Sequence, residues 1–277
     1  MAFSVAMSVY GKDDPVWFGV AIDSILNQTL PPDEIVLVVD GPVPPALNAV
    51  IEEYEKQPLF RVIRFAENRG LGEALRQAVL AAKYDIIARM DSDDISVPDR
   101  FAQQIAFFEA HPETDILGGD IAEFIGEPEN IVAYRTVPKT HEEICAYLKV
   151  RCPYNHMTVM FRKQAVLDAG NYQDCFWNED YYLWIRMAEH GCNMANTGTV
   201  LVQMRTGEDM YRRRGGKKYF RSEVFLQKYM LSHKTIGIGT FCMNVLKRLI
   251  LQILLPNRVR GWVFRKFARR SVTQNGN

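Results

Sequence analysis

Three carboxylates stand close together in the stretch "DSDD", which comprises Asp91, Asp93 and Asp94. The preceding residues "YDIIA" are apolar and predict a buried strand. Like charges at this spacing repel one another, and burial strengthens the repulsion. Either water must therefore solvate all three side chains, or a positive charge must lie beside them.

The first 120 residues alternate between apolar strands and helices. Strands are predicted at 3–10, 35–40, 60–65, 85–90 and 115–124. Helices are predicted from the cap "DDP" (13–15), at 45–56, at 71–82 and at 98–110. The predicted apolar face of the first helix consists of Trp17, Val20, Ala21, Ile25 and Leu26. This alternation with buried strands indicates a parallel sheet that helices cover on both faces.

The remaining chain has a mixed pattern. A strand is predicted at 156–163, a helix at 178–191, and a late strand at 199–206. From about residue 217 the chain is predicted to be helical. The sequence therefore predicts a main domain over 1–215 and a helical, basic region over 216–277.

Charge is divided unevenly along the chain, although its 33 basic and 33 acidic residues balance. Residues 211–277 contain 16 Lys/Arg and one acid, Glu223, which leaves 17 bases and 32 acids in residues 1–210. The tail 245–270 combines apolar and basic residues, a pattern typical of amphipathic segments that lie in a membrane interface. We expect this tail to dock on a membrane surface, and we expect no nucleic-acid partner because the acidic body would repel phosphate.

The cysteines and the N-terminus indicate a cytosolic setting. Five scattered cysteines form no C-x-x-C pair, which favours reduced thiols and disfavours a zinc site. No basic region followed by a long apolar core begins the chain, and no run of 18 apolar residues occurs. The expected location is therefore the cytoplasm, with the basic tail placing the protein peripherally on a membrane.

Polar residues follow several predicted strands: Tyr10, Asp40, Asn68–Gly70 and Asp91–Asp94. In open parallel sheets, ligands bind beyond the carboxyl ends of the strands, so these groups should converge on one crevice. Neither G-x-G-x-x-G nor G-x-x-x-x-G-K-[ST] is present to hold a phosphate. A divalent cation on the D-x-D carboxylates is the remaining way to hold a diphosphate, and it would supply the positive charge that the cluster needs.

The ordered segments "FSVAMSVY", "SILNQTLPPDEIVLVVDGP", "NRGLGEALRQA" and "DIIARMDSDD", with a later Glu-Asp pair, resemble the family 2 inverting glycosyltransferases. The likeness covers roughly residues 3–210 and is greatest to bacterial enzymes of O-antigen, capsule and exopolysaccharide synthesis. It implies the GT-A fold, a Rossmann-like α/β architecture with a mainly parallel sheet flanked by helices.

The resemblance also implies roles for individual residues on the donor side. Tyr10 and Asp40 match positions that contact the uracil and ribose of a UDP-sugar, and Arg69 lies in the loop that approaches the nucleotide. Asp93 matches the direct ligand of Mn²⁺ or Mg²⁺, with Asp91 nearer the ribose. At "VVDGP" the chain departs from relatives that carry a second acid there.

Further positions match the reacting side of the family. Glu179 and Asp180 match its E-D pair, with Asp180 as the base that accepts the proton of an attacking hydroxyl. His156 would contact acceptor or phosphate, and the loop carrying Arg212 and Arg213 would act as a lid over phosphates. The implied reaction moves galactose or glucose, or an N-acetylated form, from a UDP-sugar to a polyprenyl-diphosphate-linked saccharide.

Other interpretations of these residues remain open at this point. The DSDD carboxylates could form a turn and a helix cap, Asp180 could be an acid that the helix dipole favours at a helix N-terminus, and His156 could be structural. The Arg loop could be a solvated charge run, the C-terminal apolar stripe could pack on the body, and the aromatic residues of 177–184 could be core. Alternative functions are a nucleotidyltransferase that forms a nucleotide-sugar and a non-catalytic protein of the membrane surface.

Overall fold

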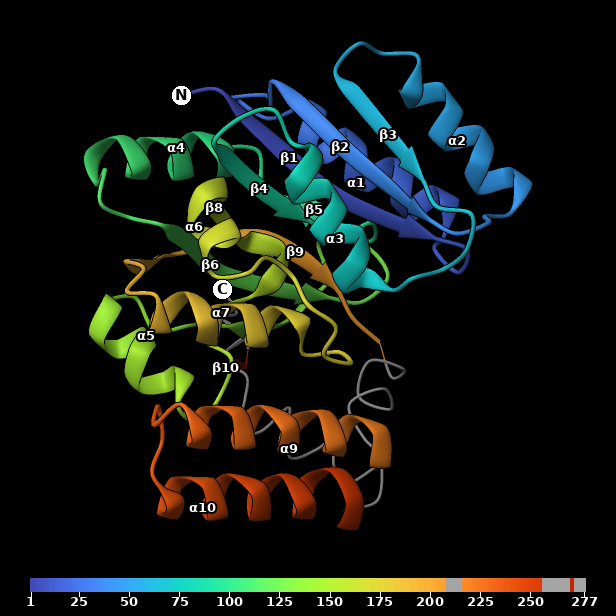
Figure 1. Cartoon of the computed structure of the whole chain (residues 1–277). Coiled ribbons are helices and arrows are strands. Elements are labelled where there is room, and N and C mark those ends of the chain that lie inside the picture. Colours follow the sequence, from blue (N-terminus) through green and yellow to red (C-terminus); the bar gives the residue numbers. More distant parts are fainter. Residues whose placement is uncertain (208–215, 256–269, 272–277) are drawn as a thin grey trace, which may run out of the picture.

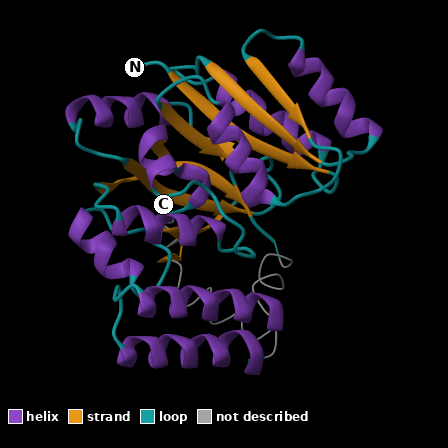
Figure 2. Ribbon diagram, in the orientation of Figure 1, coloured by secondary structure: helices purple, strands orange, loops and turns teal. Residues whose placement is uncertain are grey.

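The structure, a computed structural model, describes residues 1–207, 216–255 and 270–271. Its described strands form a ten-stranded sheet flanked by helices, which Figures 1 and 2 show from one side. The strand order is β10-β7-β6-β8-β4-β1-β2-β3, and β9 pairs with β5 and β6. The strands are β1 (Phe3–Tyr10), β2 (Glu34–Asp40), β3 (Phe60–Arg64), β4 (Ile86–Met90), β5 (Ile95–Ser96), β6 (Ile116–Phe124), β7 (Ile131–Arg135), β8 (Met160–Arg162), β9 (Met194–Arg205) and β10 (Arg270–Ser271).

The N-terminal half of the sheet is parallel, as the sequence predicts. β1 pairs in parallel with both β2 and β4, and β2 pairs in parallel with β3. Two hydrophobic cores lie on opposite faces, because alternate residues of β1 join different clusters: Val5 and Met7 pack in one and Ala6 in the other. The helices of this half are α1 (Pro15–Leu26), α2 (Pro45–Glu55), α3 (Leu71–Ala81) and α4 (Arg100–Ala110). The prediction that helices cover both faces of the sheet is confirmed.

The second half of the sheet is mixed. β8 is antiparallel to β4 and β6, β7 is antiparallel to β6, and β9 is parallel to β6. The strand predicted at 156–163 is interrupted by a 3₁₀ turn over His156–Thr158, so only the short β8 forms there. Helices in this half are α5 (His141–Leu148), α6 (Lys163–Asp168) and α7 (Glu179–Glu189).

Helix α1 begins where the sequence predicts, but its buried face differs from the predicted one. The Asp14 carboxylate accepts hydrogen bonds from the backbone N–H groups of Val16 and Trp17 at 2.8 and 3.2 Å. The buried residues are Phe18, Ala21, Ile22 and Ile25, whereas Trp17 and Val20 are exposed. The prediction was wrong for those two, since Phe18 takes the inward position and Trp17 instead packs under the guanidinium of Arg205, 4.6 Å from its ring centre.

Gly41 allows the chain to turn sharply after β2. Its φ is +87°, and an added Cβ would lie 2.6 Å from the backbone nitrogen of Asn68. Gly41→Ala is therefore expected to displace the 67–70 loop and to destabilise the fold by about 1–3 kcal/mol. Thermal unfolding measures this loss. Gly239→Ala is the matched control, because nothing lies within 4 Å of the added Cβ there; equal melting temperatures for the two variants would contradict the prediction.

The C-terminal described segment forms a helical pair. Helix α9 spans Lys217–Ser232, α10 spans Ile238–Leu249, and a π-helical turn covers Ile250–Leu254. In Figure 1, α9 lies between α7 and α10, so that α10 is the outermost layer of the molecule. Among the described residues, no helix combines the length and apolar character needed to cross a membrane.

Candidate active site

The ends of β1, β2 and β4 lie at one edge of the sheet, as predicted for a ligand crevice. Tyr10 is in register with Asp40, and Met7 with Met90. Asp40 is buried, and its carboxylate accepts hydrogen bonds from the backbone N–H groups of Arg69 (2.6 Å) and Gly70 (2.9 Å). Asp40 thus fixes the conformation of the loop that carries Arg69.

The DSDD cluster can hold a metal ion, since one carboxylate oxygen from each of Asp91, Asp93 and Asp94 lies within 4.8 Å of the others. The three acids nevertheless differ in their surroundings. Asp94 is buried and accepts a hydrogen bond from the Arg205 backbone N–H at 2.9 Å; burial raises its pKa. Asp91 forms an ion pair with Arg89, whose side chain is 2% exposed. Part of the positive charge that the cluster requires therefore comes from Arg89, to which the sequence analysis gave no role.

Asp13 is a second residue that the sequence analysis missed, because it was assigned only to the helix cap. Its Oδ2 accepts a hydrogen bond from the Ser92 hydroxyl at 2.8 Å and from the Tyr10 backbone N–H at 3.1 Å. Burial raises the pKa of Asp13 to about 6. Its position three residues past the end of a strand was the available signal.

One cavity of about 570 Å³ is lined by Asp91 of the D-x-D motif and by both acids of the Glu-Asp pair. Asp91 lines it from the end of β4, and Glu179 and Asp180 line it from the first turn of α7. Arg89 and His156 also line it. Four other predicted site residues do not line the cavity: Tyr10, Asp40, Arg69 and Asp93. Tyr10 and Asp40 end β1 and β2, and Arg69 and Asp93 follow β3 and β4. The structure thus brings Asp91 and the Glu-Asp pair to one cavity.

Both acids of the Glu-Asp pair have perturbed proton affinities. Burial, with the nearby Asp180 charge, raises the pKa of Glu179 to about 7. Burial also raises the pKa of Asp180, and this effect is opposed by the Tyr181 backbone N–H, Arg89 and Arg135. The Cys152 thiol donates to Asp180 Oδ2 at 3.7 Å. Carboxyl groups whose pKa lies closer to neutrality are better proton acceptors, as a general base requires.

Replacing Glu179 with glutamine should change how stability depends on pH. The folded state holds the Glu179 proton more tightly than the unfolded chain, so the parent protein loses stability as pH rises from about 4.5 to about 7. Glu179→Gln removes this loss. The variant is expected to be more stable than the parent by about 1–3 kcal/mol above this window and nearly equal below it. Chemical denaturation at several pH values measures the difference; a constant difference at all pH values would contradict it.

His156 is held as a neutral imidazole beside the cavity. Its Nε2 lies 2.9 Å from the Tyr172 hydroxyl, and burial together with the Arg89 charge holds its pKa well below the usual value. His156 can therefore offer a hydrogen bond but not a charge. The predicted phosphate residues Arg212 and Arg213 lie outside the described residues.

The aromatic residues around α7 divide between core and cavity. Tyr181, Tyr182 and Trp184 are buried, as the core interpretation predicts. Trp177 is 44% exposed and lines the cavity. Its φ of +57° is uncommon for a bulky residue, which makes this position a candidate for contact with a sugar ring.

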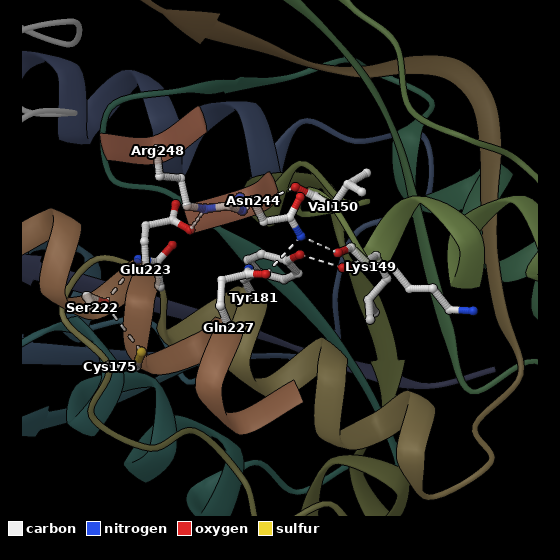
Figure 3. A network of polar contacts seen from close by, with 11 residues as sticks. Lys149, Val150, Cys175, Tyr181, Ser222, Glu223, Gln227, Asn244 and Arg248 are labelled. Carbon is white, nitrogen blue, oxygen red and sulfur yellow. Dashed lines mark hydrogen bonds and ion pairs between the residues drawn. The ribbon is translucent and has the colours of Figure 1, made fainter. Parts of the chain in front are cut away.

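The C-terminal helices form part of the cavity wall. Asn244 of α10 donates to the Lys149 carbonyl at 2.9 Å, and Arg248 donates to the Val150 carbonyl at 3.1 Å while pairing with Glu223 of α9 (Figure 3). These contacts fix the loop that places Cys152 against Asp180. The domain boundary near residue 215 stays a prediction, but helices beyond it line the same cavity.

A further contact ties α9 directly to the start of α7. The Asn178 side chain, adjacent to Glu179, donates to the Ser222 hydroxyl at 3.0 Å. Tyr181 of α7 donates from its hydroxyl to the Leu148 carbonyl. The position of the catalytic candidates therefore depends on residues more than 40 positions later in the sequence.

The fold and the cavity are those expected of a glycosyltransferase, and comparisons with known proteins agree. Residues 4–167 match the family described as Glycosyl transferase family 2. An uncharacterized glycosyltransferase of Haemophilus influenzae is 44% identical over 98% of this chain and 100% of its own length. The amylovoran biosynthesis glycosyltransferase AmsE of Erwinia amylovora is 36% identical over 95% of this chain and 98% of its own length. The chain belongs to glycosyl transferase family 2.

Another relative has a named reaction, and solved structures share the fold. The UDP-Gal:alpha-D-GlcNAc-diphosphoundecaprenol beta-1,3-galactosyltransferase of Escherichia coli is 34% identical over 97% of each chain. Staphylococcus aureus TarS in complex with UDP-GlcNAc superposes with a TM-score of 0.69 at 16% identity, covering 96% of this chain and 76% of that one. The mannosyltransferase PcManGT of Pyrobaculum calidifontis, in complex with GDP-Man and Mn²⁺, superposes with a TM-score of 0.61 at 16% identity, covering 93% of this chain and 71% of that one. The GT-A fold is confirmed.

Proposed function

We propose that this enzyme transfers a hexose from a UDP-sugar to a hydroxyl of a lipid-diphosphate-linked saccharide, with inversion at the anomeric carbon. The observation that carries the proposal is the single cavity that Asp91 and Asp180 share. The names of the relatives from Escherichia coli and Erwinia amylovora support a role in bacterial surface polysaccharide synthesis. Galactose or glucose, plain or N-acetylated, is the proposed donor sugar.

The donor is proposed to bind at the carboxyl edge of β1, β2 and β4. Asp93 and Asp91 would hold Mn²⁺ or Mg²⁺, because three carboxylate oxygens already lie within 4.8 Å of one another there. The bound ion would offset negative charge on the departing diphosphate. Tyr10, Asp40 and the Arg69 loop would position the uridine.

Asp180 is proposed to act as the base. An alcohol has a very high pKa, so it needs a proton acceptor as its oxygen attacks the sugar carbon. Asp180 lines the cavity. The Tyr181 backbone N–H donates to Asp180 Oδ1 at 2.6 Å and holds the carboxylate in place. One displacement by a hydroxyl on the face opposite to UDP inverts the configuration, which gives a β-linked product from an α-linked donor.

The acceptor is proposed to occupy the part of the cavity next to the C-terminal helices. Lys247 and Arg151 line this part and match the charge of a diphosphate. Trp177 offers a ring face for a sugar, and the neutral His156 offers a hydrogen bond. Because such acceptors are anchored in lipid, the proposed location is the cytoplasmic face of the inner membrane.

Release of UDP tests the proposal. The protein is incubated with UDP-Gal, UDP-Glc or their N-acetyl forms, with a short-chain lipid-diphosphate sugar as acceptor, with Mn²⁺ or with EDTA. The expected result is UDP release and a glycosylated acceptor for one donor, both suppressed by EDTA. Pyrophosphate release from UTP and a sugar phosphate, without transfer to the acceptor, would instead identify a nucleotidyltransferase.

A further inference from the structure

Helix α10 and its π-helical extension expose apolar side chains and bury polar ones. Asn244 and Gln252 are buried, at 1% and 6% exposure. The exposed large hydrophobic residues of this segment are Ile238, Met243, Leu246, Ile250 and Leu254, which are between 41% and 65% exposed. We call these five residues the α10 stripe. A surface helix of a globular protein usually shows the opposite arrangement.

Four members of the α10 stripe, Met243, Leu246, Ile250 and Leu254, are continuous along one side of the helix, because successive members are three or four positions apart. Ile238, at the N-terminus of α10, lies apart from this line. Polar contacts explain why the other face is inward: Asn244 donates to Gln227 at 2.8 Å and Arg248 pairs with Glu223 (Figure 3). Since α10 is also the outermost layer in Figure 1, the stripe forms an apolar surface at the far end of the molecule from the parallel strands.

The charge around the stripe indicates what it meets. Residues 216–255 contain seven Lys/Arg and a single acid, Glu223, and that acid is paired with Arg248. An apolar stripe on a basic helical pair is complementary to an anionic lipid surface, which attracts basic residues close to it. A second copy of this surface would carry the same positive charge and would be repelled. We propose that the α10 stripe is the surface by which this protein docks on anionic membrane lipid.

This proposal deepens the membrane location proposed above, and it does not depend on the donor or on the reaction. The stripe and the cavity lie on two sides of one helix, because Asn244 and Lys247 of α10 line the cavity. Docking through the stripe would therefore hold the acceptor side of the cavity next to the lipid surface. A diphosphate anchored in that surface would need to reach past only one helix.

Cys242 gives a direct probe of this face. It is the exposed cysteine of the five, and it directly precedes Met243 on α10. Its rate of alkylation by a charged, water-soluble maleimide is measured by peptide mass spectrometry on the full chain. Vesicles of phosphatidylcholine with phosphatidylglycerol are expected to slow this rate about tenfold or more, whereas pure phosphatidylcholine vesicles have little effect. The partly exposed Cys145 is the internal control and is expected to react at an unchanged rate.

Paired substitutions give a second readout. Leu246→Gln combined with Ile250→Gln is expected to weaken co-sedimentation with the anionic vesicles about tenfold or more. Leu80→Gln, an exposed leucine of α3, is the matched control and should bind as the parent does. UDP release with a water-soluble acceptor should be the same for all three proteins, so a failure of docking and a failure of the proposed reaction are distinguishable.

Two results would overturn the proposal. One is an alkylation rate that anionic vesicles leave unchanged while the paired variant still sediments with them. The other is a Cys242 that is already protected without vesicles, because residues 256–277 or a second copy would then cover the stripe. Loss of the vesicle effect at about 1 M salt, where the Debye length falls to about 3 Å, would support the electrostatic part of the docking.

Discussion

Replacing Asp180 with asparagine is expected to lower turnover by about 10²–10⁴-fold, the usual contribution of a general base. The amide is the same size as the carboxylate and can still accept the Tyr181 backbone N–H, so the first turn of α7 should be preserved. It cannot take the proton of an attacking hydroxyl. Steady-state kinetics at saturating donor and acceptor measure the effect, which should appear in kcat with little change in the affinity for UDP.

Cys152→Ser is the matched control for this substitution. Cys152 touches the same carboxylate, at 3.7 Å, and serine keeps a hydrogen-bond donor there without altering the base. Its turnover should stay within about threefold of the parent, since no proton acceptor is lost. An Asp180→Asn enzyme with more than about a tenth of parental turnover would show that another group accepts the proton.

Asp93→Asn is expected to abolish the dependence of UDP binding on a divalent cation and to weaken that binding by about 10²-fold or more, because a carboxylate ligand is lost beside a highly charged diphosphate. Titration calorimetry with UDP, in Mn²⁺ and in EDTA, measures this. The parent should bind UDP tightly only in Mn²⁺, whereas the variant should bind weakly in both conditions.

Asp99→Asn is the control for charge alone. Asp99 is an exposed acid near the same segment, and its side chain makes no capping hydrogen bond to α4. It should retain the parental response to Mn²⁺. Two results would contradict a metal site at the DSDD cluster. One is a parent protein that binds UDP as tightly in EDTA as in Mn²⁺, and the other is an Asp93→Asn protein that binds UDP in Mn²⁺ as tightly as the parent does.

The parallel half of the fold could be predicted because its determinants are local. Buried strands alternate with helices over the first 120 residues, and the "DDP" cap fixes the start of α1. The convergence of Asp40 and Asp91 at one edge follows from parallel pairing. The mixed half could not be predicted in the same way, because β8 is only three residues long and pairs with β4 and β6, which lie far away in the sequence.

The site shows the same division between local and distant determinants. The acids Asp91 and Asp180 were recognisable from their motifs, and the cavity brings them together. The contribution of Arg89 could not be recognised, because a basic residue inside an apolar strand does not indicate which acid it will pair with. The cavity walls formed by α9 and α10 were also not predicted. In the sequence Asn244 and Arg248 are ordinary polar residues, and nothing there indicates their contacts with Lys149 and Glu223.

The central claim is that a cation at Asp91 and Asp93 holds a nucleoside diphosphate in the cavity where Asp180 meets the incoming alcohol. A crystal structure grown with Mn²⁺ and UDP, with anomalous data collected at the manganese edge, tests it most directly. The account predicts an anomalous peak on the Asp93 carboxylate, in contact with the diphosphate, and an open path from the β-phosphate to Asp180. Manganese bound elsewhere, or UDP in a site that Asp180 cannot reach, would contradict it.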